Sequence, residues 1–582
     1  MKKLLITLIL LAGFIQIQAQ LSIHAEENAR YKSEGVWQNE NVKTEKFFSN
    51  DTCSLRKIVF GYHPYWVGSV WKNYNWNLLS DLCYFSFEVD PATGLSTTQN
   101  DWQTAAVIDT ALAHGTRVHM CITLFSGHST FFSSIEAQQT LIDTTIKLLK
   151  ARHAQGVNLD FEAVPSSQAA KYNAYLIAFA DSVHNAIPGS VISIASPAVD
   201  WSGMLDISEL SQHLDYFMIM GYDFYWSGSS TAGPVAGLYP MESGYQYAVS
   251  STISWYLKNG APASKLLLGV PYYGRDWSVN KEIAPAQTTG SSFAVTYKNY
   301  RNNTTDYNWS TIHTEHNSQS VYYSYDLSGW RQCFVDDADR LAQKYDLVNR
   351  SALAGIGIWA LGYDNGFSDL WDKIRDKFSN CAQPLCSDTL YDSGGPAFSY
   401  KQDEDYTHTI SIGSGQTLIV DLLEFNTEAG ADSLLFYDGS NTSAPLLAAY
   451  SGIQSPVTLF PTGNSIAFHF KAGSATQKSG YKFVYKCPSA GENEIFTTEN
   501  DFTIYPNPNS GTFTLTHNKS ANSAVFATIT DISGKVILKA EFDFAKENKI
   551  IVNLDKNIEP GIYFLTLQQK NKLPQMKKLV IQ

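Results

Sequence analysis

The sequence predicts an α/β fold, a (β/α)₈ TIM barrel, followed by two all-β sandwich-like modules. Eight strand-like apolar runs recur between residues 57 and 361, and most are followed by a stretch with helical periodicity. After Cys381 the helical periodicity disappears, and Gly, Ser and Asp punctuate short β-like runs. Eight such units favour barrel closure over a doubly wound open sheet, which is the competing topology. A chain of 582 residues is also too long for one ordinary domain.

The predicted strands share short length and high apolar content, and they are 57–63, 81–87, 117–124, 156–162, 190–196, 216–222, 266–272 and 355–361. Helices are predicted at 137–155 and 169–187, where apolar residues recur at three- and four-residue intervals. The interval between the last two strands is longer and rich in Tyr and Asn. We expect residues 277–350 or so to form a small insertion on the barrel face that carries the C-terminal strand ends.

Composition narrows the possible partners. The net charge is −13 and no Lys/Arg block occurs in the folded region, which argues against a nucleic-acid partner. The chain holds 33 Tyr, 31 Phe and 13 Trp, a content typical of sugar-stacking proteins and also of many β-rich folds.

The first residues predict export. Residues 1–19 combine two lysines, an apolar stretch and a small residue at Ala19, which is typical of a secretory signal peptide. The apolar stretch is too short for a membrane anchor, and no later segment is long enough to span. Residues 20–52 then form an N-terminal polar segment, and the barrel domain is expected at 53–382.

The seven cysteines show no metal-ligand spacing, so disulfides or buried thiols are expected in an oxidising setting. Cys53 precedes the first strand and Cys381 follows the last helix, which places both at the non-catalytic end of the barrel. We predict that they pair. Cys83 and Cys121 lie inside predicted strands and are expected to be buried thiols.

The stretch GVNLDFEAV, residues 156–164, carries the strongest candidate chemistry. Asn158, Asp160 and Glu162 alternate along a strand and therefore share one face. Glu162 is at the strand end, with Asp160 about 6.6 Å deeper and Asn158 deeper still, able to hydrogen-bond Asp160. Burial and the neighbouring charge should raise the pKa of Glu162, which suits a general acid. A structural polar layer in the barrel core is the alternative.

Other strand ends favour the functional interpretation, because polar and aromatic residues converge at the same mouth, as sugar recognition requires. These residues are Tyr62, Phe87, Met220, Tyr222, Asp223, Tyr273, Arg275 and Trp359.

In these motifs the chain resembles glycoside hydrolase family 18, the chitinases and their relatives, over roughly residues 57–376. The strand-four acids, Met-x-Tyr-Asp at 220–223, Tyr-Gly-Arg at 273–275 and Trp359 occur in the family's order. Gln155 and Asn158 replace the first two acids of the pattern Asp-Gly-x-Asp-x-Asp-x-Glu. The GVN-x-DFE form also resembles a branch that includes spore-cortex and peptidoglycan N-acetylglucosaminidases.

The resemblance implies retaining hydrolysis assisted by the substrate's own 2-acetamido group. It implies that Glu162 is the acid and later the base, that Asp160 orients the acetamide, and that Tyr222 hydrogen-bonds its carbonyl oxygen. Trp359 would lie under the reacting sugar, with Asp223, Tyr273 and Arg275 around it. Neither a metal nor an organic cofactor is implied.

Residues 386–487 resemble a CUB domain, most specifically in DSLLFYDG at 432–439. Cys386 and Cys487 bracket the module and are candidates for a disulfide, although the family's first pairing is usually more local. Asp432 and, loosely, Glu428 match calcium ligands of some members, but Gly473 stands where a third acid is expected. The module is therefore expected to be structural or to bind a protein or glycan.

After a linker predicted at 488–500, residues 501–582 resemble the type A C-terminal sorting domain of type IX secretion. The matching pieces, YPNPNSGTF, DISGKVI, PGIYFL and KKLVIQ, occur in order. They imply passage through the periplasm and across an outer membrane by the secretion machinery, followed by release or surface attachment.

The leading functional hypothesis is a secreted hydrolase that cleaves β-1,4 bonds after N-acetylglucosamine in chitin or chitooligosaccharides. The same mechanism acting on peptidoglycan or an N-glycan core is the second hypothesis. A non-catalytic chitin-binding lectin on the same barrel is the third, but such lectins typically lose the acid, which is present here as Glu162.

Overall fold

The computed structural model describes residues 22–37, 53–242, 245–487, 502–517, 524–531, 536–544, 548–554, 558–569 and 575–582. The predicted signal peptide and the predicted 488–500 linker lie outside these residues. No helix in the described part of the chain is both long and apolar enough to cross a membrane.

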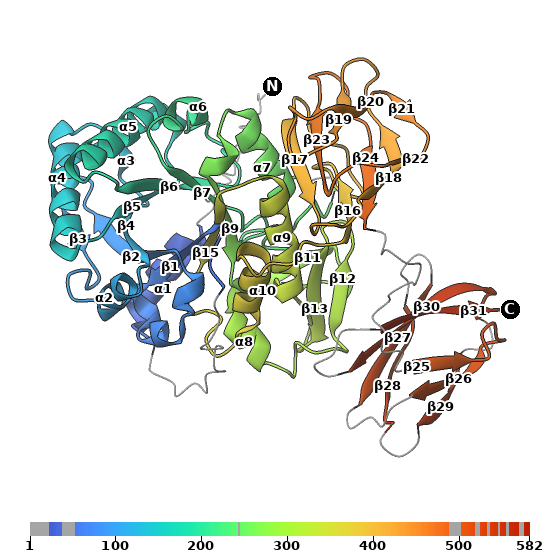
Figure 1. The fold of residues 1–582 in the computed structure, drawn as a ribbon. Coiled ribbons are helices and arrows are strands. Elements are labelled where there is room, and N and C mark those ends of the chain that lie inside the picture. The colour runs from blue at the N-terminus through green and yellow to red at the C-terminus, as the bar shows by residue number, and fades with distance from the viewer. Residues whose placement is uncertain are drawn as a thin grey trace, which may run out of the picture. The chain divides into compact units, whose positions relative to one another are not determined.

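Eight parallel strands form a closed barrel in the first part of the chain (Figure 1). In chain order they are β1 (Ile58–Pro64), β2 (Asp81–Val89), β4 (Arg117–Leu124), β5 (Gly156–Phe161), β6 (Val191–Pro197), β7 (Tyr216–Met220), β9 (Leu266–Pro271) and β15 (Gly355–Trp359). Pairing of β1 with both β2 and β15 closes the barrel. The predicted TIM barrel is confirmed, and each strand overlaps its predicted run.

Helices cover the outside of the barrel. The main ones are α2 (Ala106–Ala113), α4 (Ile135–Arg152), α5 (Ala169–Ala186), α7 (Val249–Lys258), α9 (Ala338–Arg350) and α10 (Asp369–Phe378). Shorter helices are α3 (His128–Phe131) and α6 (Ile207–Leu210). The apolar repeats that predicted α4 and α5 are the residues these helices bury, which explains why both could be located from periodicity.

Between β9 and α9 the chain forms a separate antiparallel sheet. Its strands are β10 (Tyr273–Val279), β11 (Ala286–Thr296), β12 (Ile312–Glu315), β13 (Ser320–Asp326) and β14 (Trp330–Phe334), joined by β8 (Thr231–Ala232) and accompanied by α8 (Tyr297–Asn302). Because β10 begins directly after β9 ends, the insertion extends the C-terminal mouth of the barrel. The short β3 (Ser96–Thr98) pairs with the end of β2.

One further helix, α1 (Ile23–Glu34), precedes the barrel in the chain. The side chain of Ser22 caps it by accepting a hydrogen bond from the Ala25 amide, and Gly35 follows its last turn with φ of 83°. The polar N-terminal segment therefore contains an ordered helix that hydrophobic periodicity did not indicate.

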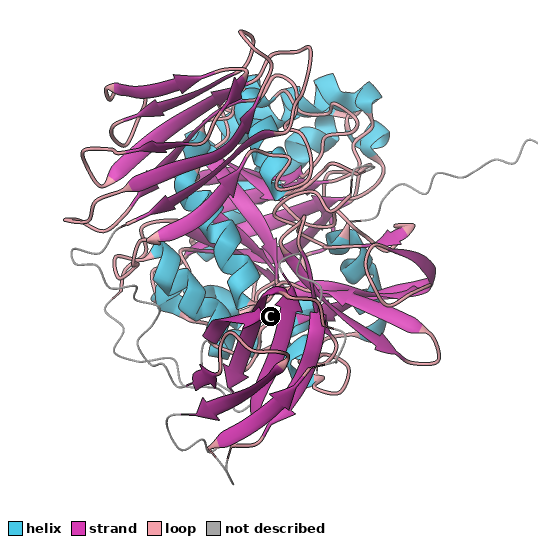
Figure 2. Ribbon diagram, turned by 90° about the vertical axis from the view of Figure 1, so that its right-hand side faces the viewer, coloured by secondary structure: helices cyan, strands magenta, loops and turns pink. Residues whose placement is uncertain are grey.

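The second module is a two-sheet β-sandwich made of strands and loops (Figure 2). Its strands are β16 (Ser387–Tyr391), β17 (Asp405–Ser411), β18 (Ile419–Asn426), β19 (Ser433–Tyr437), β20 (Leu446–Tyr450), β21 (Ile453–Gln454), β22 (Val457–Leu459), β23 (Ser465–Lys471) and β24 (Gly480–Lys486). β17 contacts α7 and α9 of the barrel. At the position compared with a calcium site, the Gly473 amide donates to Asp432 Oδ1 at 2.6 Å.

The C-terminal module is also all-β. It contains β25 (Phe502–Tyr505), β26 (Thr512–His517), β27 (Val525–Asp531), β28 (Val536–Phe542), β29 (Lys549–Asn553), β30 (Gly561–Gln569) and β31 (Gln575–Ile581). These strands form one three-stranded and one four-stranded antiparallel sheet around their own apolar core.

The barrel and the sandwich each contain one disulfide. Cys53 pairs with Cys381, as predicted, and Cys386 pairs with Cys487 across the ends of the sandwich. Cys83, Cys121 and Cys333 are buried free thiols within the described residues, which confirms the prediction for the first two.

Candidate active site

The strand β5 places its polar residues at three depths. Glu162 directly follows the strand, and Asp160 and Asn158 are fully buried below it. The Asn158 side chain accepts from the Tyr62 hydroxyl at 2.9 Å and donates to Ser193 Oγ at 2.9 Å. Asn158 therefore ties three barrel strands together beneath the site, instead of hydrogen-bonding Asp160 as expected from the sequence.

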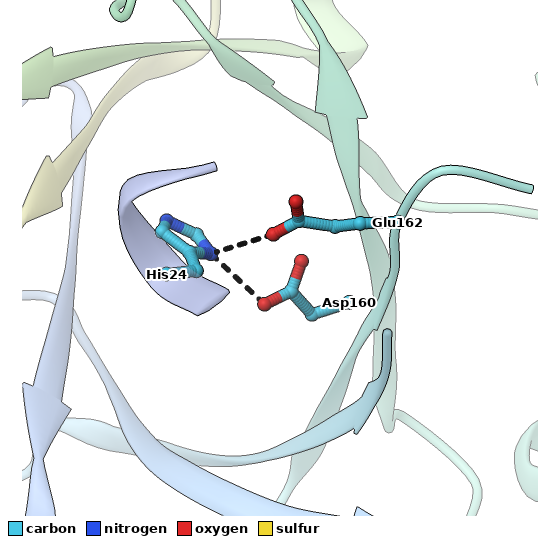
Figure 3. Close-up of side chains that lie close together, drawn as sticks. All are labelled: His24, Asp160 and Glu162. Atoms are coloured by element: carbon cyan, nitrogen blue, oxygen red, sulfur yellow. Dashed lines mark hydrogen bonds and ion pairs between the residues drawn. The ribbon is translucent and has the colours of Figure 1, made fainter. Parts of the chain in front are cut away.

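A residue from outside the barrel lies against the two carboxyl groups. Figure 3 shows α1 inside the ring of strands, with His24 pointing toward Asp160 and Glu162. His24 Nδ1 is 2.9 Å from Asp160 Oδ2 and 3.5 Å from Glu162 Oε1. The other ring nitrogen, Nε2, is 2.8 Å from the Tyr222 hydroxyl. The imidazole thus meets the three residues that the sequence assigned to catalysis at the strand ends.

Burial controls the protonation of this group. It raises the pKa of Asp160 to about 7. It also raises the pKa of Glu162 well above its ordinary value, and the negative charge of Asp160 acts in the same direction. Burial lowers the pKa of His24 to about 4, so the imidazole is neutral near pH 7. With Asp160 ionised, Nδ1 carries the proton and donates to it, and Nε2 accepts from Tyr222.

The acidic and basic residues at the ends of β7 and β10 form a second group. Asp223 accepts from the Tyr273 hydroxyl at 2.6 Å and from the Ile23 amide at 2.9 Å. Burial raises the pKa of Asp223, while the positive charge of Arg275 opposes this shift. Arg275 is fully buried and its guanidinium donates to Glu26 of α1 at 2.8 Å.

Trp359, at the end of β15, forms the apolar floor. The His24 ring stacks on its indole, with ring centroids 3.6 Å apart, and Tyr62 and Phe85 contact it edge-on. The sequence had assigned Phe87 to this mouth, but Phe85 is the ring that meets both Trp359 and His24. The register between β2 and β4 shifts between Tyr84 and Phe87, which the strand pattern alone does not reveal.

Cavities flank α1 on both sides. One, of about 460 Å³, is lined by Ser22 of the helix cap together with Glu162, Met220, Tyr222 and other residues at the ends of β5 to β7 and in the loops that follow them. The other, of about 1400 Å³, is lined by the later turns of α1, from Glu27 to Glu34, and by the insertion around α8. Met220 lines the first cavity together with Glu162 and Tyr222.

The ligand atoms of His24, Asp160 and Glu162 lie within 4.8 Å of one another, a spacing that can also hold a metal ion. Direct hydrogen-bond distances from His24 to Asp160 and Tyr222 account for both ring nitrogens without one.

Sequence reasoning missed the contribution of α1 and of one barrel residue, Tyr363. The buried carboxylate of Glu27 accepts from Trp359 Nε1 at 3.0 Å and from the Tyr363 hydroxyl at 2.6 Å. The capping pattern was a signal that could have found the helix, because Ser22 precedes it, Glu26 is in its first turn, Lys32 is in its last turn, and Gly35 follows.

Comparisons with protein families identify the two modules that follow the barrel. The CUB domain family matches residues 386–485, and the secretion system C-terminal sorting domain matches residues 503–582. The sorting domain indicates export by type IX secretion to the cell surface or the medium.

Two relatives match the barrel part of the chain. A putative sporulation-specific glycosylase of Bacillus subtilis is 24% identical over 319 residues, covering 53% of this chain and 68% of that protein. A class V chitinase of Arabidopsis thaliana is 25% identical over 270 residues, covering 42% of this chain and 70% of that protein.

Among solved structures, the Group IV chitinase of Ostrinia furnacalis has 18% sequence identity and a TM-score of 0.49, covering 55% of this chain and 98% of its own. The family of glycosyl hydrolases 18 matches residues 27–364, which is more than half of the chain. The barrel, with its paired acids at β5 and the tryptophan at the end of β15, belongs to glycosyl hydrolases family 18, and the protein is a chitinase-like glycoside hydrolase.

Proposed function

We propose that the protein hydrolyses β-1,4 bonds after N-acetylglucosamine in chitin or chitooligosaccharides, with retention of configuration. The observation that supports this most is the convergence of Asp160 and Tyr222 on one planar group above Trp359. An aromatic floor with two opposed polar partners suits a sugar ring that carries an amide.

The acetamide of the sugar fits these partners. Its N–H and its carbonyl oxygen lie on either side of one carbon, as do the two nitrogens of the His24 ring. Asp160 accepts from the amide N–H, and the Tyr222 hydroxyl donates to the carbonyl oxygen. This holds the carbonyl oxygen against the anomeric carbon, where it serves as the nucleophile.

Glu162 supplies the proton. Burial and the charge of Asp160 keep its carboxyl group protonated, so it can donate to the glycosidic oxygen as that bond breaks. The acetamide oxygen bonds to the anomeric carbon, giving an oxazolinium ion whose positive charge faces Asp160. Glu162, now ionised, takes a proton from the incoming water. The water oxygen attacks the anomeric carbon and opens the oxazolinium ring, so the configuration at that carbon is retained overall.

The remaining acid at the strand ends, Asp223, supports this mechanism over direct attack by a carboxylate. Asp223 is held by the Tyr273 hydroxyl and lies near Arg275, so it is placed to bind sugar hydroxyl groups. Met220, Tyr62, Tyr273 and Arg275 are assigned to the walls of the substrate site.

For the sandwich at 386–487 we propose binding of a glycan or protein beside the barrel.

A second polymer fits the same chemistry. Peptidoglycan and N-glycan cores also contain N-acetylglucosamine, and a relative is named as a sporulation-specific glycosylase. A lectin role is less favoured, because Glu162 is present and its pKa is raised as an acid requires.

The test is a proton NMR time course with a chitin hexasaccharide, using the full chain carrying His24→Ala so that the imidazole is absent from the site. β-Anomeric products appearing first would support retention. The same chain with Glu162→Gln is the control and should form products at least about 10²-fold more slowly. α-Anomeric products would contradict the mechanism, and cleavage of peptidoglycan alone would transfer the assignment to the second polymer.

A further inference from the structure

Helix α1 occupies the place where the proposed function puts the substrate. Its residues contact the strand-end residues assigned to sugar binding, and these contacts are His24 with Asp160, Tyr222 and Trp359, Ile23 with Asp223, Glu26 with Arg275, and Glu27 with Trp359. A sugar ring cannot stack on Trp359 while the His24 ring lies 3.6 Å above it.

We propose that residues 22–34 are an intramolecular inhibitor of this enzyme, in which the His24 imidazole stands in for the acetamide of the substrate. The inference rests on the proposed function for the identity of the substrate. The enzyme is latent while α1 is docked, and it becomes active when the segment is displaced or removed.

The imidazole reproduces the hydrogen-bonding pattern of the amide. A neutral imidazole has one N–H donor and one nitrogen acceptor, separated by one carbon, and an amide presents N–H and C=O in the same relation. Asp160 and Tyr222 meet the two nitrogens at 2.9 Å and 2.8 Å. The flat ring also offers a face to Trp359. A lysine or aspartate at this position would supply neither the pair nor the stacking.

Charged side chains one turn farther along hold the helix in register. Glu26 pairs with the buried guanidinium of Arg275 at 2.8 Å. Glu27 is itself buried and satisfies Trp359 Nε1 and the Tyr363 hydroxyl. These polar groups of the barrel would otherwise face a sugar or water, so α1 replaces ligand contacts instead of covering an apolar surface.

The outward side of α1 has a different character. Arg30 and Glu34 are about half exposed and pair with each other across one helical turn. They make no hydrogen bond to the strand-end acids. A change at Arg30 therefore tests the helix itself without touching the docked face.

The helix also divides the cleft at its reacting centre. Ser22 lines the cavity beside Glu162, and Glu27, Tyr31 and Glu34 line the larger cavity on the other side. A polymer cannot pass from one cavity to the other through the space that α1 fills. Removal of the helix joins them into one groove across the catalytic acids.

The experiment compares three full-length mature chains: the unmodified chain, His24→Ala, and the matched control Arg30→Ala. Hydrolysis of a chitin hexasaccharide is followed by chromatography, and amide hydrogen exchange of residues 23–34 is followed by mass spectrometry. We expect His24→Ala to raise the initial rate at least tenfold and to speed exchange in α1. Arg30→Ala should leave the rate unchanged.

A synthetic peptide of residues 22–36 added to the His24→Ala chain should inhibit it competitively, raising KM without lowering kcat. The Glu26→Ala chain serves as a second variant if His24→Ala fails to fold, and it should also be activated. A rate for His24→Ala within twofold of the unmodified chain would overturn the proposal, as would rapid exchange of α1 in the unmodified chain.

The two readouts separate the inhibitor from the chemistry. Slow exchange of α1 that becomes fast in His24→Ala, with no hydrolysis by any chain, would support docking of α1 and count against hydrolysis of chitin. Equal hydrolysis by all three chains, with fast exchange throughout, would support the proposed function and reject the inhibitor.

Discussion

His24 and Trp359 stack with their ring centroids 3.6 Å apart and their planes 24° from parallel, although they come from opposite ends of the barrel sequence. This pairing covers the Trp359 indole, the proposed substrate floor, with a residue of the same chain. Signals of the His24 ring therefore report whether α1 occupies the site. The chemistry of Glu162 is best examined in the His24→Ala chain, which lacks this ring.

Replacing Glu162 by Gln in the His24→Ala chain should lower kcat on a chitin oligosaccharide by about 10²–10⁴-fold, because general acid catalysis contributes on that order. Gln is close in shape and cannot donate the proton to the leaving oxygen. Rate measurements alongside circular dichroism check this, and the fold should be unchanged. Near-native turnover would remove Glu162 from the role of acid.

Replacing Asp160 by Asn should move the alkaline limb of the pH–rate profile to lower pH. The negative charge of Asp160 helps to raise the pKa of Glu162, so its loss lowers that pKa. Glu162 must be protonated to act, and activity is lost as pH rises through its pKa, which now lies lower. The rate should also fall, because Asn cannot balance an oxazolinium charge. Profiles of kcat/KM in the His24→Ala background test this, and an unshifted limb would contradict the coupling.

The His24 ring should remain neutral at pH 5.5 in the unmodified chain, because burial lowers its pKa to about 4. A released ring would titrate near its ordinary 6.5. As pH falls from 6.5 toward 4, the released form gains the proton that the docked form excludes. The His24 ring by itself therefore weakens docking with falling pH, by up to about 1.4 kcal/mol per pH unit. Glu27 acts in the opposite direction, because burial raises its pKa to about 7.

The carboxyl groups of Asp160, Glu162 and Asp223 lie around the His24 ring, and Tyr222 meets it with its hydroxyl. The carboxyl groups favour a protonated ring but do not outweigh its burial. Nitrogen chemical shifts of the imidazole, with the His24→Ala chain as the assignment control, would test the prediction. A ring that is half protonated at pH 6.5 would contradict it.

Replacing Cys53 by Ser should lower the free energy of unfolding by about 2–5 kcal/mol. The Cys53–Cys381 bond joins residues 328 apart, and its loss frees the unfolded chain. Urea unfolding at fixed pH measures the change. Cys53→Ser/Cys381→Ser is the control and should match the single variant, because both lack the same bond. An additive second loss would show that the two cysteines act independently.

The sequence predicted the barrel well because its strands are continuous apolar runs and its covering helices have apolar stripes. It also located Asp160 and Glu162, since alternation along one strand sets the face on which they lie. The sequence placed Phe87 at the mouth, whereas Phe85 is the ring that contacts Trp359. The difference arises from the irregular pairing of β2 with β4, which depends on contacts between strands.

Helix α1 could not be found by the same criterion. An ordinary surface helix covers an apolar core and shows an apolar stripe. The surface under α1 is a site of acids, hydroxyls and indole, so the helix buries His24, Glu27 and Asn28 together with Ile23 and Tyr31. Polar residues directed inward look like a solvated segment when the partner surface is unknown.

The order of the chain gives α1 a further property. Glu27 and Trp359, which hydrogen-bond in the folded site, are 332 residues apart, and β15 is the last barrel strand to be made. When β15 completes the site, its occupant is already attached to the same polypeptide. A tethered ligand acts at an effective concentration that does not fall when the protein is diluted. Latency of this kind would persist however thinly the enzyme spreads after export, and would end only through an event on the chain itself or through a polymer that outcompetes the tether.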